Sequence, residues 1–202
     1  MTNGDPAERI LDAADELFSS RGFPGVSMRD VAEAAGVKKA SVFYHFKSKD
    51  ELFGRVLERY YAAHARVLAA AETDGDASER LHRFIDAYLD FIEDHHRYVR
   101  LVQMEITSGS AHLPQIARGL SLLHERVQAI LEGLVPESGP LAARQFFVSF
   151  AGIVNNYYLY APALSAAWGG EDPLSAGPRR ERREHVHWIV DALLARLPGS
   201  SA

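Results

Sequence analysis

Apolar residues recur every three or four positions along almost the whole chain, a spacing that puts them on one face of a helix. The first such stripe spans residues 10–18, and Gly22 followed by Phe23 is a typical helix stop. Later stripes span residues 52–71, 81–102, 116–134 and 186–197. There is no Asn-Gly hairpin and no sustained alternation of apolar and polar residues, so no sheet is expected. The pattern predicts an all-α chain of about nine helices.

Two short helices are predicted on either side of a tight turn. Ser27 and Asp30 have the spacing of a capping box, and Gly36 ends the helix that they begin. In the next short helix, Val42 and Phe46 are four residues apart and can face inward together. Two short helices joined by a glycine-containing turn predict a helix-turn-helix, because glycine adopts the backbone conformation that lets the second helix cross the first.

The second helix of this pair is basic and aromatic on its outside. Residues 36–49 contain four lysines and no acidic residue, a formal charge of +4 within a chain of net charge −5. Phe43, Tyr44 and His45 are consecutive, so they cannot all be buried on one face of a helix. A phosphate backbone favours such a patch, although four lysines alone are more often only a solvated surface. The helix-turn-helix is therefore the candidate DNA-binding site.

Residues 26–52 resemble the DNA-binding signature of the tetracycline-repressor (TetR) family. Their glycine, aromatic, phenylalanine and Ser-Lys positions coincide with that signature without a gap, whereas the rest of the chain agrees only in length and helical character. The resemblance implies an N-terminal three-helix DNA-binding domain over residues 1–50 and a helical ligand-binding and dimerisation domain over residues 51–202. It also implies a homodimer whose third helix reads the major groove of double-stranded operator DNA.

The resemblance carries over to individual residues. The positions that usually face bases are occupied by Lys39, Ala40, Ser41 and Phe43. The positions that usually hold phosphates are occupied by Tyr44, His45 and Lys49, and the resemblance implies a base or phosphate contact for Arg29.

Two residues depart from the family pattern. Phe43 stands where tyrosine is usual and offers only apolar contact, and Lys38 replaces a common capping residue, which weakens the cap but adds a charge. These departures keep open an alternative, a helical interaction protein with a degenerate helix-turn-helix that no longer binds DNA.

The resemblance further implies a small-molecule pocket among the C-terminal helices. Polar side chains occur there on otherwise apolar helices, and aromatic residues with a few amides commonly build ligand sites. The candidate ligand-binding residues are Gln103, Met104, Phe146, Phe150, Asn155 and Tyr158. The amides could instead form hydrogen bonds across a dimer interface, and the sequence leaves both interpretations open.

No charged residue occurs between Gln145 and Gly170, a stretch long enough to span a membrane. Asn155 and Asn156 near its middle would be costly in lipid, so a helix buried in a core or an oligomer interface is the better interpretation. Dimerisation is expected through this helix, over residues 146–160, and through the last helix, over residues 186–197. No membrane partner is expected.

Composition narrows the function classes further. The chain has no cysteine, which excludes disulfides, cysteine-based zinc sites, iron–sulfur clusters and a thiol nucleophile, and which fits a reducing cytoplasm. None of the nine histidines has a helical metal-ligand spacing, and no GxSxG, HExxH or GxGxxG motif occurs. We therefore expect no enzyme activity, no metal and no cofactor. The sequence predicts a ligand-responsive regulator, a repressor that binds a palindromic operator and is released by a small hydrophobic effector.

Overall fold

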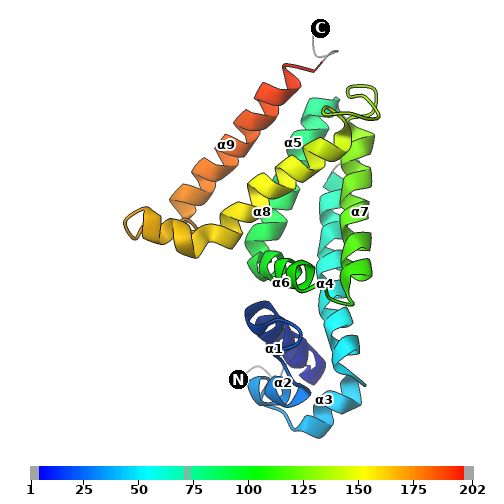
Figure 1. Cartoon of the computed structure of the whole chain (residues 1–202), viewed down its shortest axis with the longest axis vertical. Helices are drawn as coiled ribbons and strands as arrows, with labels where there is room; N and C mark the ends of the chain where they lie inside the picture. The colour runs from blue at the N-terminus through cyan, green and yellow to red at the C-terminus, as the bar shows by residue number, and fades with distance from the viewer. Residues whose placement is uncertain (1–4, 71, 73, 198–202) are drawn as a thin grey trace. The chain divides into compact units, whose positions relative to one another are not determined.

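The chain is mainly helical in the part that the structure describes. The computed structural model describes residues 5–70, 72 and 74–197, and over these residues it forms nine α-helices and no strand (Figure 1). The helices are α1 (Pro6–Arg21), α2 (Met28–Ala34), α3 (Lys39–His45), α4 (Lys49–Ala70), α5 (Ala77–Asp94), α6 (His96–Ser108), α7 (Leu113–Ile130), α8 (Ala143–Ala167) and α9 (Ala176–Leu194). The predicted all-α fold is confirmed. No helix among the described residues is both long and apolar enough to cross a membrane.

The helices form two compact units. The first unit contains the chain up to Ala63 together with His95–Ala117, and the second contains His64–Asp94 together with the chain from Arg118 onward. Helices α4 and α7 each belong partly to both units. Helix α6 packs against α1 and so joins the first unit, and the implied domains 1–50 and 51–202 stay a prediction.

The core of the first unit is built around aromatic rings. Phe53 of α4 lies edge-on to Phe18 of α1 at 5.1 Å and to Phe23, just after α1, at 5.3 Å between ring centroids. The His112 ring, which comes from before α7, lies 4.3 Å from Phe53. Phe53 is completely buried in this cluster. The cluster therefore supports the end of α1, which leads directly into the helix-turn-helix.

Helix α8 is the uncharged segment, and it is buried along only one face. Val154 and Ala161 are buried, whereas Val148 and Tyr160 are exposed to 64% and 55%. Pro162 lies inside the helix. The prediction of a helix buried on all sides therefore does not hold within a single chain, and the exposed apolar face leaves the expected oligomer interface as a proposal.

One element boundary differs from the sequence-based prediction. Helix α7 ends at Ile130, so the predicted stripe to residue 134 continues into a turn in which Leu131 is still buried. Helix α9 begins at Ala176 and carries Pro178 in its first turn. Proline is tolerated in a first helical turn because the backbone N–H groups there have no partner within the helix.

Candidate functional site

The helix-turn-helix is fixed by short-range hydrogen bonds. The Asp30 N–H donates to Ser27 Oγ at 3.2 Å, and the Ser27 N–H donates to Asp30 Oδ2 at 2.8 Å, so the predicted capping box is present. The Ser27 hydroxyl also donates to Asp30 Oδ2 at 2.7 Å, and this bond together with that from the Ser27 N–H lowers the pKa of the Asp30 carboxyl. Gly36 has a φ of +64°, and the Val37 N–H closes the turn on the Ala32 carbonyl at 3.0 Å.

Helix α3 is anchored by two side chains and presents the others outward. Val42 is fully buried and Phe46, directly after the helix, is 4% exposed. Lys38 begins α3 without a side-chain capping bond, as its residue type predicts. Phe43 is 44% exposed and Tyr44 is 85% exposed, so aromatic surface faces out as expected. The Lys39 ammonium lies 5.6 Å from the centroid of the Phe43 ring.

Most predicted DNA-contacting residues are accessible. The exposed ones are Arg29, Lys38, Lys39, Ala40, Phe43 and Tyr44, and the half-buried ones are Ser41 and His45. All but Arg29 lie on or next to α3, around the anchor Val42. This surface combines lysines, small residues and aromatic rings, which suits a nucleic-acid groove.

Lys49 is engaged inside the protein. Its ammonium donates to the carbonyls of Phe23 at 2.9 Å and Val26 at 3.0 Å, and it lies 4.1 Å from the centroid of the Phe23 ring. Two of its three N–H donors are therefore used to hold the segment between α1 and α2. The resemblance implies a phosphate contact for this residue, whereas these bonds favour a positioning role, and the phosphate contact stays a prediction.

A buried polar cluster supports the same segment. Glu105 of α6 is only 1% exposed, and it accepts hydrogen bonds from the Ser110 hydroxyl at 2.5 Å and the Phe23 N–H at 3.4 Å. His112 Nδ1 lies 3.0 Å from the same carboxylate. Nothing in the sequence pattern distinguishes Glu105 from a surface acid, so sequence reasoning missed this cluster.

The second unit contains an apolar cavity. Its lining side chains come from α5, α7 and α8 and the turn after α7: Leu81, Phe84, Ile85, Tyr88, Leu123, Val127, Leu131, Phe146, Phe147, Phe150, Ala151 and Val154. Its free volume is about 30 Å³, enough for about one water molecule. A larger molecule therefore requires the lining side chains to move apart.

An open groove lies between α8 and α9. It encloses about 710 Å³, with Val148, Tyr160 and Trp168 among the apolar residues and Glu181 and Arg182 among the charged ones. Trp188 on α9 is 64% exposed. Apolar surface bordered by charged residues is the usual composition of a protein–protein interface.

Comparisons with known proteins agree with this geometry. A sequence profile of the bacterial regulatory proteins of the tetR family matches residues 10–56. The HTH-type transcriptional regulator RutR of Escherichia coli strain K12 is 30% identical over 165 residues, which make up 79% of this chain and 77% of RutR. This chain belongs to the TetR family.

Two further relatives agree with that membership. The HTH-type transcriptional activator FasR of Mycolicibacterium smegmatis is 30% identical over 147 residues, so the match spans 72% of this chain and 66% of FasR. A crystal structure of a tetR-family regulatory protein from Rhodococcus RHA1 superposes with a TM-score of 0.72 at 22% identity, covering 94% of this chain and 97% of that one. The TetR-family relatives are DNA-binding transcriptional regulators rather than enzymes.

The structure brings together only some of the predicted ligand-binding residues of this TetR-family chain. Phe146 and Phe150 line the cavity, and Asn155 accepts a hydrogen bond from the lining residue Tyr88 at 3.0 Å. Tyr158 is not among the lining residues; burial raises the pKa of its phenol, and the nearby Glu93 carboxylate raises it further. Gln103 and Met104 belong to the first unit, where Gln103 is exposed.

Tyr88 is the polar residue of the cavity lining, and sequence reasoning missed it. Its position in the α5 stripe was consistent with ordinary core packing, and nothing in the sequence pairs it with Asn155, 67 residues later. The feature of the sequence that could have indicated Tyr88 is its phenol on an otherwise hydrocarbon face of the predicted helix. Burial of this hydroxyl raises the pKa of Tyr88 to about 12, so the phenol stays neutral at physiological pH.

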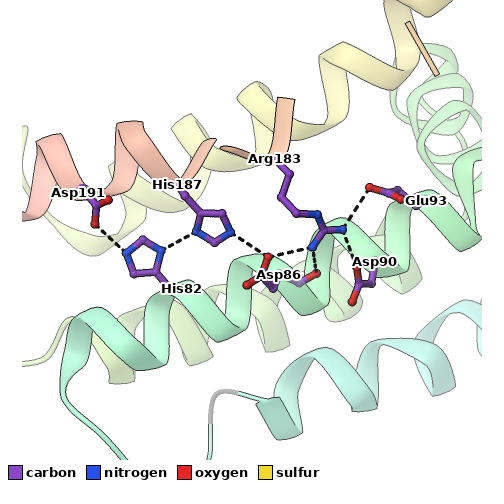
Figure 2. A network of polar contacts seen from close by, with 7 residues as sticks. All are labelled: His82, Asp86, Asp90, Glu93, Arg183, His187 and Asp191. Atoms are coloured by element: carbon purple, nitrogen blue, oxygen red, sulfur yellow. Dashed lines mark hydrogen bonds and ion pairs between the residues drawn. The ribbon is translucent and has the colours of Figure 1, made fainter. Parts of the chain in front are cut away.

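A chain of polar contacts joins α9 to α5 (Figure 2). His82 Nδ1 lies 2.6 Å from His187 Nδ1, His82 Nε2 lies 2.8 Å from Asp191, and His187 Nε2 lies 2.8 Å from Asp86. Three hydrogen bonds need three protons, and two neutral imidazoles carry only two. With both carboxylates ionised, the complete chain therefore requires one positive charge on the histidine pair.

Arg183 extends these contacts along α5, as Figure 2 shows. Its guanidinium lies 2.9 Å from Asp86, 2.5 Å from Asp90 and 3.2 Å from Glu93. Burial tends to raise the pKa of Asp86, but the hydrogen bonds from His187 and Arg183 outweigh it and lower that pKa. No group of three or more possible ligands for a metal ion is found in the described part of the chain.

Proposed function

We propose that this protein is an effector-responsive transcriptional repressor that binds a palindromic operator as a dimer in the cytoplasm. The observation that carries the proposal is α3, which is anchored by the buried Val42 and Phe46 and presents lysines and aromatic rings outward. One such helix contacts only a few base pairs, and two helices about one DNA turn apart give the affinity and the palindromic site of a dimer.

DNA binding is tested by a gel shift with the DNA upstream of the chain's own gene. Wild-type protein is expected to bind it in a salt-dependent way. Lys39→Ala should relax the preference at one or two base pairs per half-site, each by about 1–3 kcal/mol. Arg66→Ala removes an exposed charge from α4, outside the helix-turn-helix, and serves as the matched control. Failure of the wild-type protein to bind would favour the alternative, an interaction protein with a degenerate helix-turn-helix.

The dimer is proposed to form through α8 and α9. Their groove has apolar residues that are exposed in the single chain, and pairing these helices with those of a second copy would form a four-helix interface. Sedimentation should give a dimer at micromolar concentration and a monomer for Val148→Asp. Leu122→Asp changes another exposed apolar residue, on α7 and outside the groove, and should remain dimeric. A monomeric wild-type protein would contradict this part of the proposal.

The effector is proposed to enter the apolar cavity of the second unit. Helix α4, which follows the helix-turn-helix, and helix α7, which contributes Leu123 and Val127 to the cavity lining, each belong to both units, which supports coupling between the cavity and the helix-turn-helix. A ligand that releases DNA must bind the DNA complex more weakly by the same factor, about 5- to 150-fold in typical systems. With n-octanol as the probe, operator affinity should fall on addition of the ligand, and Asn155→Ala should weaken this response without changing operator affinity. If Asn155→Ala instead becomes monomeric with unchanged octanol affinity, the asparagine belongs to the dimer interface.

A further inference from the structure

The cavity has an unusually simple chemical composition. Every lining side chain except Tyr88 is a hydrocarbon, and no lining residue carries a charge at neutral pH. A charged ligand group would have no counter-charge there and would lose its hydration on entry, which is costly. The cavity therefore selects an uncharged ligand, and any directed polar contact with a lining side chain must involve the Tyr88 hydroxyl.

The direction of the Tyr88 hydrogen bond decides what this hydroxyl can offer. Its O–H donates to Asn155 Oδ1 at 3.0 Å. A phenol has one proton to donate and an oxygen that can also accept. Because the proton is already used by Asn155, the Tyr88 oxygen is left as a hydrogen-bond acceptor.

We propose that the cavity binds an uncharged, largely apolar molecule that carries a hydroxyl group, and that the ligand hydroxyl donates to the Tyr88 oxygen. Asn155 is the positioning residue that sets this preference by holding the Tyr88 proton. The proposal rests on the proposed function, in that it takes the cavity to be the effector site.

A ketone or an ether can only accept a hydrogen bond. To donate to such a ligand, Tyr88 must release Asn155, whose half-buried carbonyl then lacks this partner. Loss of one hydrogen bond, or of the partner of a buried polar group, costs about 1–2 kcal/mol, which is about a tenfold change in affinity. The bond between Tyr88 and Asn155 therefore makes the cavity discriminate a hydroxyl from a carbonyl of similar size.

The test compares four probes of similar length by calorimetric titration of the full-length protein. They are n-octanol, methyl hexyl ketone, methyl heptyl ether and octanoate. Octanol is expected to bind about tenfold more tightly than the ketone and the ether after correction for their transfer from water to hydrocarbon. Octanoate, which is charged at neutral pH, should not bind detectably. Equal corrected affinities for alcohol, ketone and ether would overturn the proposal.

Three variants separate this mechanism from a general packing effect. Asn155→Leu frees the Tyr88 proton, so ketone affinity should rise relative to octanol and the preference should disappear or reverse. Tyr88→Phe removes the hydroxyl and should bind all three neutral probes alike. Tyr61→Phe removes a phenol of the first unit, one that donates to the Gln115 carbonyl, and should keep the wild-type preference. A preference that survives in Tyr88→Phe contradicts the proposal, and the wild-type ranking remains a test even if that variant does not fold.

The outcomes also separate this inference from the proposed function. Binding of the neutral probes without any preference for the alcohol refutes the inference but leaves the cavity as a ligand site. If none of the neutral probes binds, both the effector site and the inference fail. Binding with the expected preference but no change in operator affinity supports the inference and contradicts only the coupling to DNA.

Discussion

The helix-turn-helix and the second unit are specified over very different distances along the chain. In the helix-turn-helix, the capping box and the glycine turn each join residues no more than five positions apart. In the second unit, the bond from Tyr88 to Asn155 spans 67 residues and the contact of His82 with His187 spans 105. The comparison teaches that the proposed DNA-binding surface is determined by residues that are close together in the sequence. The cavity and the α5–α9 contacts, in contrast, form only after the helices have packed.

The largest expected effect comes from removing the aromatic cluster that supports the helix-turn-helix through contacts between residues far apart in the sequence. Phe53→Ala leaves every signal of the helix-turn-helix intact but empties the centre of the aromatic cluster, so it should lower the free energy of unfolding by about 3–5 kcal/mol. Urea denaturation measures the loss, and Leu122→Ala at an exposed site should change stability by less than about 0.5 kcal/mol. A loss of unfolding free energy below 1 kcal/mol would mean that the helix-turn-helix is stabilised mainly by its local capping box and glycine turn.

Lys49 tests whether a residue of the family signature acts on DNA or on the fold. Lys49→Ala removes two hydrogen bonds from a charged donor and should destabilise the protein by about 1–3 kcal/mol in thermal or urea unfolding. If Lys49 is only a positioning residue, the slope of the logarithm of operator affinity against the logarithm of salt concentration stays unchanged in the variant. A slope shallower by about 1.8 would instead support one phosphate contact per subunit of a dimer.

Substitutions at Gly36 test how much the glycine turn of the helix-turn-helix contributes to stability. Its φ of +64° is unfavourable for residues with a Cβ, and an added Cβ would meet no other atom within 4 Å. Gly36→Ala should therefore cost about 1–2 kcal/mol through backbone strain alone. Gly36→Asn should cost less, because asparagine tolerates this conformation better. Equal losses in the two variants, measured by thermal unfolding, would argue against this explanation.

The smallest expected effect is a loss of stability at acidic pH, through the α5–α9 contacts of Asp86. The pKa of Asp86 is lowered in the fold, so its contribution to stability is present above the unfolded value of about 3.9 and is lost as the pH falls through the lower folded value. The stability difference between wild type and Asp86→Asn should therefore shrink as the pH falls below about 5. Urea denaturation at several pH values provides the measurement.

The sequence was sufficient where structure follows from neighbouring residues. The caps at Ser27 and Lys38, the turn at Gly36 and the buried pair Val42 and Phe46 were all predicted, because each depends on a few adjacent positions. The pattern could not tell where α7 ends, since Leu131 stays buried in the turn beyond the helix.

The candidate sites were predicted less completely for the same reason. Phe146 and Phe150 line the cavity, but their role in ligand binding stays a prediction, and Tyr88 became a candidate only through its contact with Asn155. Periodicity places a residue on a helix face but does not say which other helix that face meets. The internal bonds of Lys49 were hidden likewise, because its two acceptors are backbone carbonyls more than twenty residues earlier.

The distribution of tryptophan gives the molecule a built-in optical reporter. The chain has two tryptophans, Trp168 at the groove and Trp188 on α9, and both are exposed in the second unit. Their emission should be that of indole in contact with water in a single chain, and it should shift to shorter wavelength when α8 and α9 are covered by a second copy. The first unit contains no tryptophan. Intrinsic fluorescence can therefore follow assembly without a label and without direct interference from the helix-turn-helix.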